Sequence, residues 1–277
     1  MRGLQYLPAA VLMALAAGCG DPQPFVTPER LSRGLVLVLT GIEGRSPINE
    51  DICQGLNEGG VNCAIELVDW TYGLPGAYLA NLWSEARNRK KAEDIAHRVI
   101  RYQIAHPDRP VVLIGQSGGG AIALWIAESM PPGRCVDGII LLAASLSPDY
   151  VLDMALLNSR GGIVSFHSLK DWVFLGAGTF LSTTMDGKHT ESAGRVGFNV
   201  PTASTLPRAY QKVFQIAWHK EMEKAGHTGG HLTAAARPFV ARYVAPLLNV
   251  KSWDGQVMQS LLAGELTTRP AESTGGR

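Results

Sequence analysis

The stretch of sequence that decides the fold reads VVLIGQSGGGAIALWIA and covers residues 111–127. It begins with four apolar residues, the pattern of a strand buried on both faces of a parallel sheet. Gly115, Ser117 and Gly119 then form the pattern G-x-S-x-G, which runs into a helix. The small residues two positions away from Ser117 on each side would let the strand and the helix pack closely.

Five further apolar runs share the character of residues 111–114. They are residues 35–39, 64–68, 138–142, 163–166 and 213–218. Segments with helical character lie among them, at 85–105, 119–130 and 233–248. This alternation predicts right-handed βαβ crossovers and a mainly parallel α/β sheet of about six strands, with helices on both faces.

Composition indicates an ordinary globular domain. Of 277 residues, 46% are hydrophobic and 18% are charged, which predicts a substantial core. The formal net charge is only +1, so the chain has no broad positive field for polyanions. Nucleic acid is therefore not expected as a partner.

The N-terminus, residues 1–19, has the pattern of an export signal. Arg2 precedes a short apolar segment that ends in small residues. Residues 15–19 resemble the bacterial lipobox, in which a cysteine is lipidated, and this resemblance makes Cys19 the candidate. It implies an exported protein held at a membrane of the cell envelope by its lipid. Ordinary cleavage beside Ala17 would instead give a secreted protein.

The remaining boundaries follow from composition. Residues 20–33 are rich in proline at their start and are expected to be a tether. The folded domain is predicted to cover residues 34–250. Residues 251–277 become polar and are expected to form a disordered tail.

Three cysteines follow Cys19 and lack the paired spacing of a zinc site. In an exported protein, Cys53 and Cys63 are candidates for a disulfide that closes a short loop, while Cys135 is expected to be buried. Spacing alone does not show whether the two side chains point at each other.

The strand, turn and helix at 111–127 resemble the nucleophile elbow of the α/β-hydrolase superfamily, and the resemblance extends over about residues 35–248. It implies that Ser117 is the nucleophile. It also implies an acid and a histidine later in the chain, each placed after a strand.

The resemblance places the acid in the turn after residues 163–166, where Asp171 lies. Asp149 is the main alternative, because some members of the superfamily carry the acid after the preceding strand. Asp186 is a further alternative.

The histidine is expected between the last strand and the closing helix, where both His227 and His231 lie. His231 is favoured because it directly precedes the helix, as the catalytic histidine of this superfamily commonly does. Their i, i+4 spacing also occurs in metal sites, but the intervening Gly229 and Gly230 disfavour a helix and no glutamate completes the motif. We therefore expect no metal.

An oxyanion hole requires two N–H groups aimed at the carbonyl oxygen as it gains charge. The resemblance assigns one to Gly118, which follows the nucleophile. The second is expected in the loop after residues 35–39, at Ile42, with Gly41 and Glu43 as alternatives.

Together these residues predict a serine hydrolase that cleaves a carboxylic ester, in a small molecule or a polymer, through an acyl-enzyme on Ser117. No cofactor is expected. Only about 20 residues separate the strands at 138–142 and 163–166, which leaves no room there for a large cap domain. The alternatives are an acyltransferase with the same residues and a non-catalytic envelope lipoprotein. Oligomeric state is not predicted.

Overall fold

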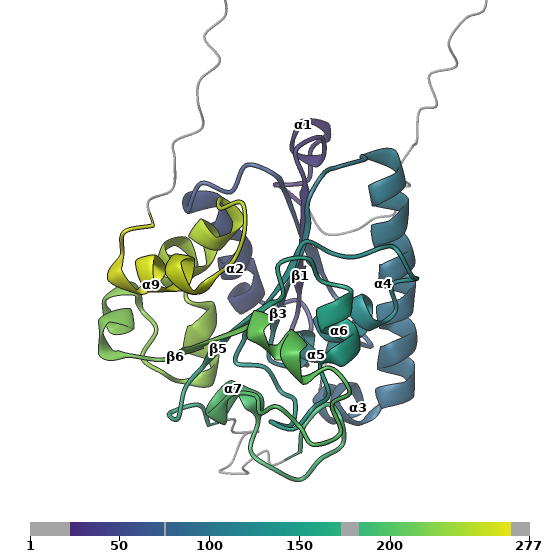
Figure 1. Ribbon diagram of the computed structural model, residues 1–277, viewed down its shortest axis with the longest axis vertical. Helices are drawn as coiled ribbons and strands as arrows, with labels where there is room; N and C mark the ends of the chain where they lie inside the picture. The colour runs from purple at the N-terminus through teal and green to yellow at the C-terminus, as the bar shows by residue number, and fades with distance from the viewer. Residues whose placement is uncertain (1–22, 75, 173–182, 267–277) are drawn as a thin grey trace, which may run out of the picture.

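A computed structural model of the protein describes residues 23–74, 76–172 and 183–266 (Figure 1). The signal segment at 1–19 and the lipidation candidate Cys19 lie outside these ranges, so both stay predictions. No helix within the described ranges is long and apolar enough to cross a membrane.

Six parallel strands form one sheet in the order β2-β1-β3-β4-β5-β6. They are β1 Leu35–Leu39, β2 Ala64–Val68, β3 Val111–Gln116, β4 Gly138–Leu142, β5 Ile163–His167 and β6 Val213–Ala217. Each strand lies where its apolar run predicts it, so the predicted fold class is confirmed. The order reverses between β1 and β3, and the carboxyl ends of strands at such a switch point commonly form binding sites.

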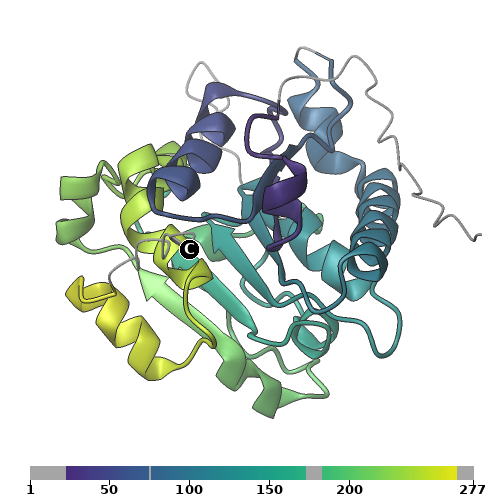
Figure 2. The same ribbon diagram turned by 90° about the horizontal axis from the view of Figure 1, so that it is seen from above.

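Helices cover both faces of the sheet, as Figure 2 shows from above. They are α1 Pro28–Leu31, α2 Pro47–Glu58, α3 Tyr78–Trp83, α4 Glu85–Ala105, α5 Gly118–Glu128, α6 Asp153–Leu157, α7 Ala193–Val196, α8 Arg237–Phe239 and α9 Gly255–Ala263. Segments of 3₁₀-helix are η1 Pro207–Lys212, η2 Lys220–Ala225, η3 His231–Ala235 and η5 Ala245–Leu248, and η4 Val240–Val244 is a turn of π-helix.

Alternate residues of β1 enter two separate cores because successive side chains of a strand point to opposite faces. Leu37 and Leu39 pack in the core that α4 and α5 cover. Val36 and Val38 pack in the other core, which α2 and the C-terminal helices cover. Burial on both faces explains why the run at 35–39 contains no polar residue.

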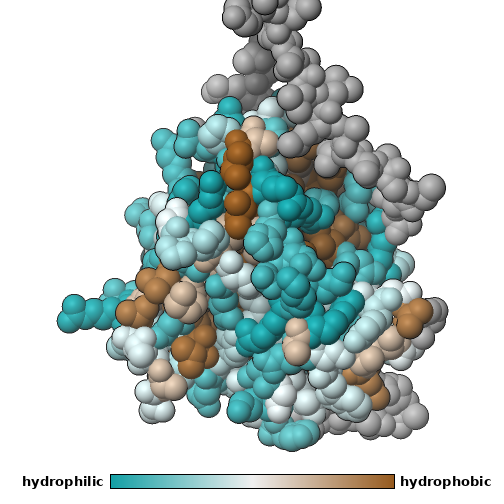
Figure 3. Space-filling view, turned by 90° about the vertical axis from the view of Figure 1, so that its right-hand side faces the viewer, coloured by the Kyte–Doolittle hydropathy of each residue, from teal (hydrophilic) through white to brown (hydrophobic). Residues whose placement is uncertain are grey.

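Helix α4 spans the predicted range 85–105. Its buried stripe includes Ala92, Ile95, Ala96 and Val99, at helical spacing. Charged side chains occupy its outer side, and the face of the molecule that carries α4 is largely hydrophilic (Figure 3). The charges are therefore a solvated helix face.

The predicted helix at 233–248 is wrong as a single helix. The structure has instead η3, α8, η4 and η5 in succession. Pro238 and Pro246 lie inside this segment, and proline lacks the N–H that a continuous α-helix needs. Each proline begins a new helical segment, within its first two residues.

The expected disordered tail is also wrong for its first part, because α9 lies within it. Asp254 caps this helix, its carboxylate accepting from the N–H of Val257 at 2.8 Å. Gly264 ends it with φ +74°, and Met258 and Leu261 are buried in the core. Residues 267–277 lie outside the described residues.

The expected tether is not free of the fold from residue 23 onward. The Gln23 carboxamide bonds the N–H and the C=O of Leu67 at 3.1 and 2.9 Å, and Phe25 O accepts from the N–H of Ile65. Both partners lie on β2, which is an edge strand with outward backbone groups to satisfy. Thr27 then caps the short helix α1.

The candidate disulfide is also not formed. Cys53 and Cys63 are free thiols, the first buried on α2 and the second half-buried before β2. Burial raises the pKa of Cys53 to about 12 and that of Cys63 to about 11, so both stay protonated at neutral pH. Cys135 is free as well, and it is only half-buried, so its expected burial is wrong.

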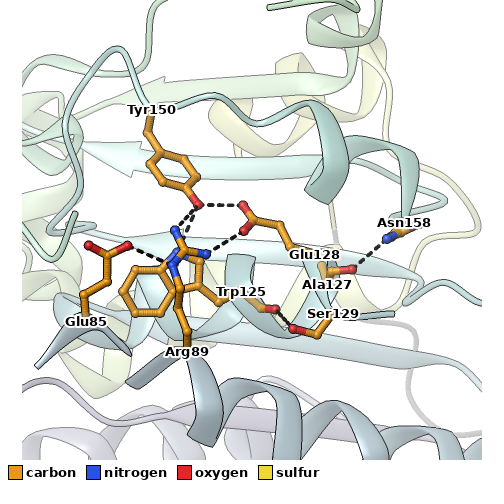
Figure 4. Close-up of polar contacts among 8 residues, drawn as sticks. All are labelled: Glu85, Arg89, Trp125, Ala127, Glu128, Ser129, Tyr150 and Asn158. Atoms are coloured by element: carbon orange, nitrogen blue, oxygen red, sulfur yellow. Dashed lines mark hydrogen bonds and ion pairs between the residues drawn. The ribbon is translucent and has the colours of Figure 1, made fainter. Parts of the chain in front are cut away.

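A polar network joins α4, α5 and the loop after β4 (Figure 4). The Arg89 guanidinium donates to Glu85 and Glu128 at 2.8 and 3.2 Å, and it lies 4.5 Å from the centre of the Trp125 ring. The Tyr150 hydroxyl accepts from Trp125 Nε1 at 2.9 Å and donates to Glu128 at 2.7 Å. Burial raises the pKa of Glu128, and the bonds from Tyr150 and Arg89 partly offset that shift. The network fixes α5, which begins at the candidate site.

Tyr150→Phe tests this network because it removes only the shared hydroxyl. We expect the free energy of unfolding to fall by about 2 kcal/mol, since Trp125 and Glu128 lose a largely buried partner. Urea denaturation measures the change. Tyr78→Phe, at an exposed position of α3, is the control and should change stability by less than about 0.5 kcal/mol. Equal losses in the two variants would contradict the role of the network.

Candidate active site

Ser117 occupies the turn between β3 and α5, with φ +54° and ψ −120°. Positive φ is uncommon for a residue with a side chain, so close packing must hold it. A Cβ at Gly115 would lie 2.2 Å from the Gly119 carbonyl oxygen, and a Cβ at Gly119 would lie 2.2 Å from that of Leu39. Both motif glycines are therefore required by the contact of α5 with β1 and β3, as the sequence predicts.

Hydrogen bonds join three buried side chains at this turn. Ser117 Oγ lies 2.8 Å from Nε2 of His231. Nδ1 of the same ring lies 2.8 Å from Oδ1 of Asp171. The three residues come from the ends of β3 and β5 and from the loop after β6, and each is less than a tenth exposed. The structure thus brings together the serine, acid and histidine that the sequence analysis favours.

The turn that carries Asp171 directly follows β5. The N–H of Asp171 donates to the Ser168 carbonyl at 2.8 Å, and Ser168 Oγ accepts from the N–H of Lys170. Arg195 donates to the Leu169 carbonyl at 2.5 Å from outside the turn. These bonds hold the backbone of the turn that carries the Asp171 carboxylate.

The loop that carries His231 packs directly on this acid turn. Gly229 has φ +95°, and a Cβ there would lie 3.0 Å from Ser168 Oγ and 2.9 Å from a carbon of Lys170. Glycine thus allows both the backbone conformation and the close approach. His231 then begins η3, facing Ser117 and Asp171.

His227 belongs to the core and does not reach Ser117 through any described hydrogen bond. Its Nδ1 lies 2.9 Å from Thr233 Oγ1, and its ring packs 4.6 Å from that of Phe239. Burial lowers the pKa of His227 to about 4, so its ring is neutral at physiological pH. Its role is to stabilise the loop before His231.

The two alternative acids stabilise other turns. Asp149 is exposed and accepts from Asn199 Nδ2 at 2.9 Å. Asp186 accepts from both the N–H and the hydroxyl of Ser147, at 3.0 and 2.6 Å. Neither carboxylate has a described bond to His231.

The two residues expected to supply the oxyanion donors are in contact. A Cβ on Gly118 would lie 2.7 Å from Cγ2 of Ile42, so the loop after β1 packs against the start of α5. Gly44 closes that loop with φ +76° and donates to the Gly41 carbonyl at 3.2 Å. Glu43 Oε2 lies beside Gly41, so the three candidate positions share one tight turn.

Sequence reasoning missed two residues that hold this turn. The buried Asn81 donates to the Ile42 carbonyl at 2.8 Å, and the indole N–H of Trp70 donates to the Thr40 carbonyl at 2.6 Å. They lie 39 and 30 positions from their partners. Pairing over such separations leaves no local pattern by which either residue could be found.

Within the described ranges, no three His, Cys, Asp or Glu side chains gather as metal ligands do. Ser117, His231 and Asp171 place an alcohol, an imidazole and a carboxylate in series. This arrangement can transfer a proton from the alcohol to the imidazole.

No protein-family model and no curated protein sequence matches this chain. Among solved structures, it is similar to lipase B of Aspergillus fumigatus, with a TM-score of 0.54 and 13% identity over 91% of this chain and 60% of that one. A metagenome-derived lipolytic enzyme gives a TM-score of 0.47 and 13% identity, over 78% and 93% of the two chains. The esterase domain of a Rhodothermus marinus protein gives 0.44 and 16%, over 80% and 88%.

This chain thus spans 60% of the length of the Aspergillus lipase. The similarity at this level of identity concerns the fold alone. Together with the sheet order, it shows that the chain has the α/β-hydrolase fold.

Proposed function

We propose that the protein is a serine hydrolase that cleaves carboxylic esters through an acyl-enzyme on Ser117. The observation that carries this proposal is the hydrogen-bonded series from Asp171 through His231 to Ser117 Oγ, with both bonds at 2.8 Å. A serine, a histidine and a carboxylate in this geometry form the usual arrangement for activating an alcohol.

The proposed reaction has two halves. Nε2 of His231 takes the Ser117 proton while Oγ attacks the carbonyl carbon, and the imidazolium then protonates the departing alcohol. Water enters next, loses a proton to His231 and attacks the acyl-enzyme, which releases the acid and restores the Ser117 hydroxyl. Asp171 keeps Nδ1 protonated and stabilises the positive ring in both halves.

The N–H groups of Gly118 and Ile42 are proposed to bind the oxyanion. Gly118 is the first residue of α5, where backbone N–H groups and the helix dipole favour negative charge. Ile42 is held against it by the Asn81 bond to its carbonyl. Donors fixed in advance need no reorganisation when charge develops on the substrate oxygen.

Ser117→Ala is the direct test of the nucleophile. We expect kcat for p-nitrophenyl acetate to fall by about 10⁴-fold or more, and labelling by a fluorophosphonate probe to disappear, because the attacking oxygen is gone. Ser129→Ala, at the other end of α5, is the matched control and should keep both. Unchanged hydrolysis in Ser117→Ala would refute the proposal. Acyl transfer to an added alcohol in preference to water would identify an acyltransferase instead.

Substitution of His231 and of His227 should have different effects on kcat and on stability. His231→Gln should lower kcat by about 10⁴-fold, since the base is lost. His227→Gln should keep kcat within about threefold and should lower stability by about 1–3 kcal/mol, because a buried polar contact is disturbed. Steady-state kinetics and urea denaturation measure the two effects. The opposite pattern would assign the base to His227.

The low pKa of His227 predicts acid sensitivity. The unfolded chain takes up a proton on this histidine below about pH 6.5, whereas the folded protein resists protonation until about pH 4. Stability contributed by the neutral ring is therefore lost as pH falls from about 6.5 to 4, by about 3 kcal/mol at most. The free energy of unfolding should thus fall less steeply across this range in His227→Gln than in the natural protein. Parallel pH profiles would contradict the buried neutral ring.

A further inference from the structure

The segment that precedes α7 contains a turn, residues 183–189, which lies against the candidate site. Its first and last residues, Thr183 and His189, form an antiparallel bridge. The N–H of Met185 donates to the Ser145 carbonyl at 2.9 Å, and the N–H of Ser145 donates to the Ser117 carbonyl at 3.1 Å. Two hydrogen bonds therefore connect the backbone of Met185 with that of the proposed nucleophile.

The turn is held firmly in this position by Asp186. Its carboxylate accepts from the N–H and the hydroxyl of Ser147, and also from Thr184 Oγ1 at 2.6 Å. The N–H of Thr184 donates to the Lys188 carbonyl at 3.0 Å. These bonds lock the turn internally and to the loop after β4. Met185 therefore cannot swing away from the site without breaking several hydrogen bonds.

The side chain of Met185 fills the space next to Gly118. It is 1% exposed. A Cβ at position 118 would lie 3.3 Å from its sulfur, 3.3 Å from the Trp70 ring and 2.7 Å from Cγ2 of Ile42. The absence of a side chain at Gly118 thus lets three apolar groups close around the residue that follows the nucleophile.

We propose that Met185 is a specificity-determining residue that limits the length of the acyl group. The inference rests on the proposed function. The carbonyl carbon of a bound ester must reach Ser117 Oγ while its oxygen faces Gly118 and Ile42, so the first acyl carbons lie close to the groups packed there. A clamped thioether at this point forms a rigid wall, and a rigid apolar wall excludes longer chains by shape.

Substrate chain length gives the readout. The natural protein should hydrolyse p-nitrophenyl acetate and butyrate with higher kcat/KM than p-nitrophenyl octanoate. Met185→Ala removes the end of the wall and should raise the octanoate-to-acetate ratio of kcat/KM by about tenfold or more. Met185→Val should give a smaller increase and disturbs the core less. Met185→Leu, which nearly conserves volume, should keep the natural ratio.

Met258→Ala is the matched control, because it truncates another buried methionine, on α9 in the core on the opposite face of the sheet. It should cost stability without changing the ratio. An unchanged ratio in both Met185→Ala and Met185→Val, or an equal change in Met258→Ala, would overturn the assignment. So would a natural protein that hydrolyses octanoate as fast as acetate.

The outcomes also separate this inference from the proposed function. Suppose that Ser117→Ala loses acetate hydrolysis while the Met185 variants keep the natural octanoate-to-acetate ratio of kcat/KM. That result would refute only the proposed role of Met185. Absence of ester hydrolysis in the natural protein, or its survival in Ser117→Ala, would refute the proposed function itself.

Discussion

The contact between the start of α5 and the end of β1 is the constraint on which the site depends. The backbone of Gly119 lies against the Leu39 carbonyl so closely that no side chain fits between them. Gly115, in β3, makes the same kind of close backbone contact with Gly119 itself. With the helix pressed onto two strands, the chain turns sharply at Ser117, and positive φ follows from the packing rather than from any preference of serine.

Two later segments of the chain carry the side chains that are hydrogen-bonded in series to Ser117. The acid turn after β5 and the loop after β6 touch at Gly229, so the position of His231 depends on that of Asp171. Each of the three side chains is buried, and burial in a region of low dielectric strengthens the bonds between them. A displacement of either segment would therefore weaken both hydrogen bonds of the imidazole.

Much of this architecture was open to prediction because it depends on local patterns. Uninterrupted apolar runs such as 35–39 mark strands buried on both faces, and the glycines around Ser117 mark the bend. The order of serine, acid and histidine along the chain then limited the candidates to a few. Helix α9 was also predictable in principle, because Asp254 is a favourable N-cap residue and Gly264 a favourable C-cap residue.

What escaped prediction depends on contacts between distant segments. The Asn81 bond to Ile42 and the position of Met185 beside Gly118 arise only when the sheet is assembled. The edge bonds of Gln23 likewise require β2 to lie at the outside of the sheet. A ten-residue spacing of Cys53 and Cys63 could not show that one thiol is packed in the core under α2.

The two thiols near the edge of the sheet have a chemical consequence. Only the thiolate attacks a disulfide, and burial raises the pKa of Cys53 to about 12 and that of Cys63 to about 11, so little of either thiol is ionised at pH 7. Exchange with glutathione disulfide or with a second molecule should accordingly be slow.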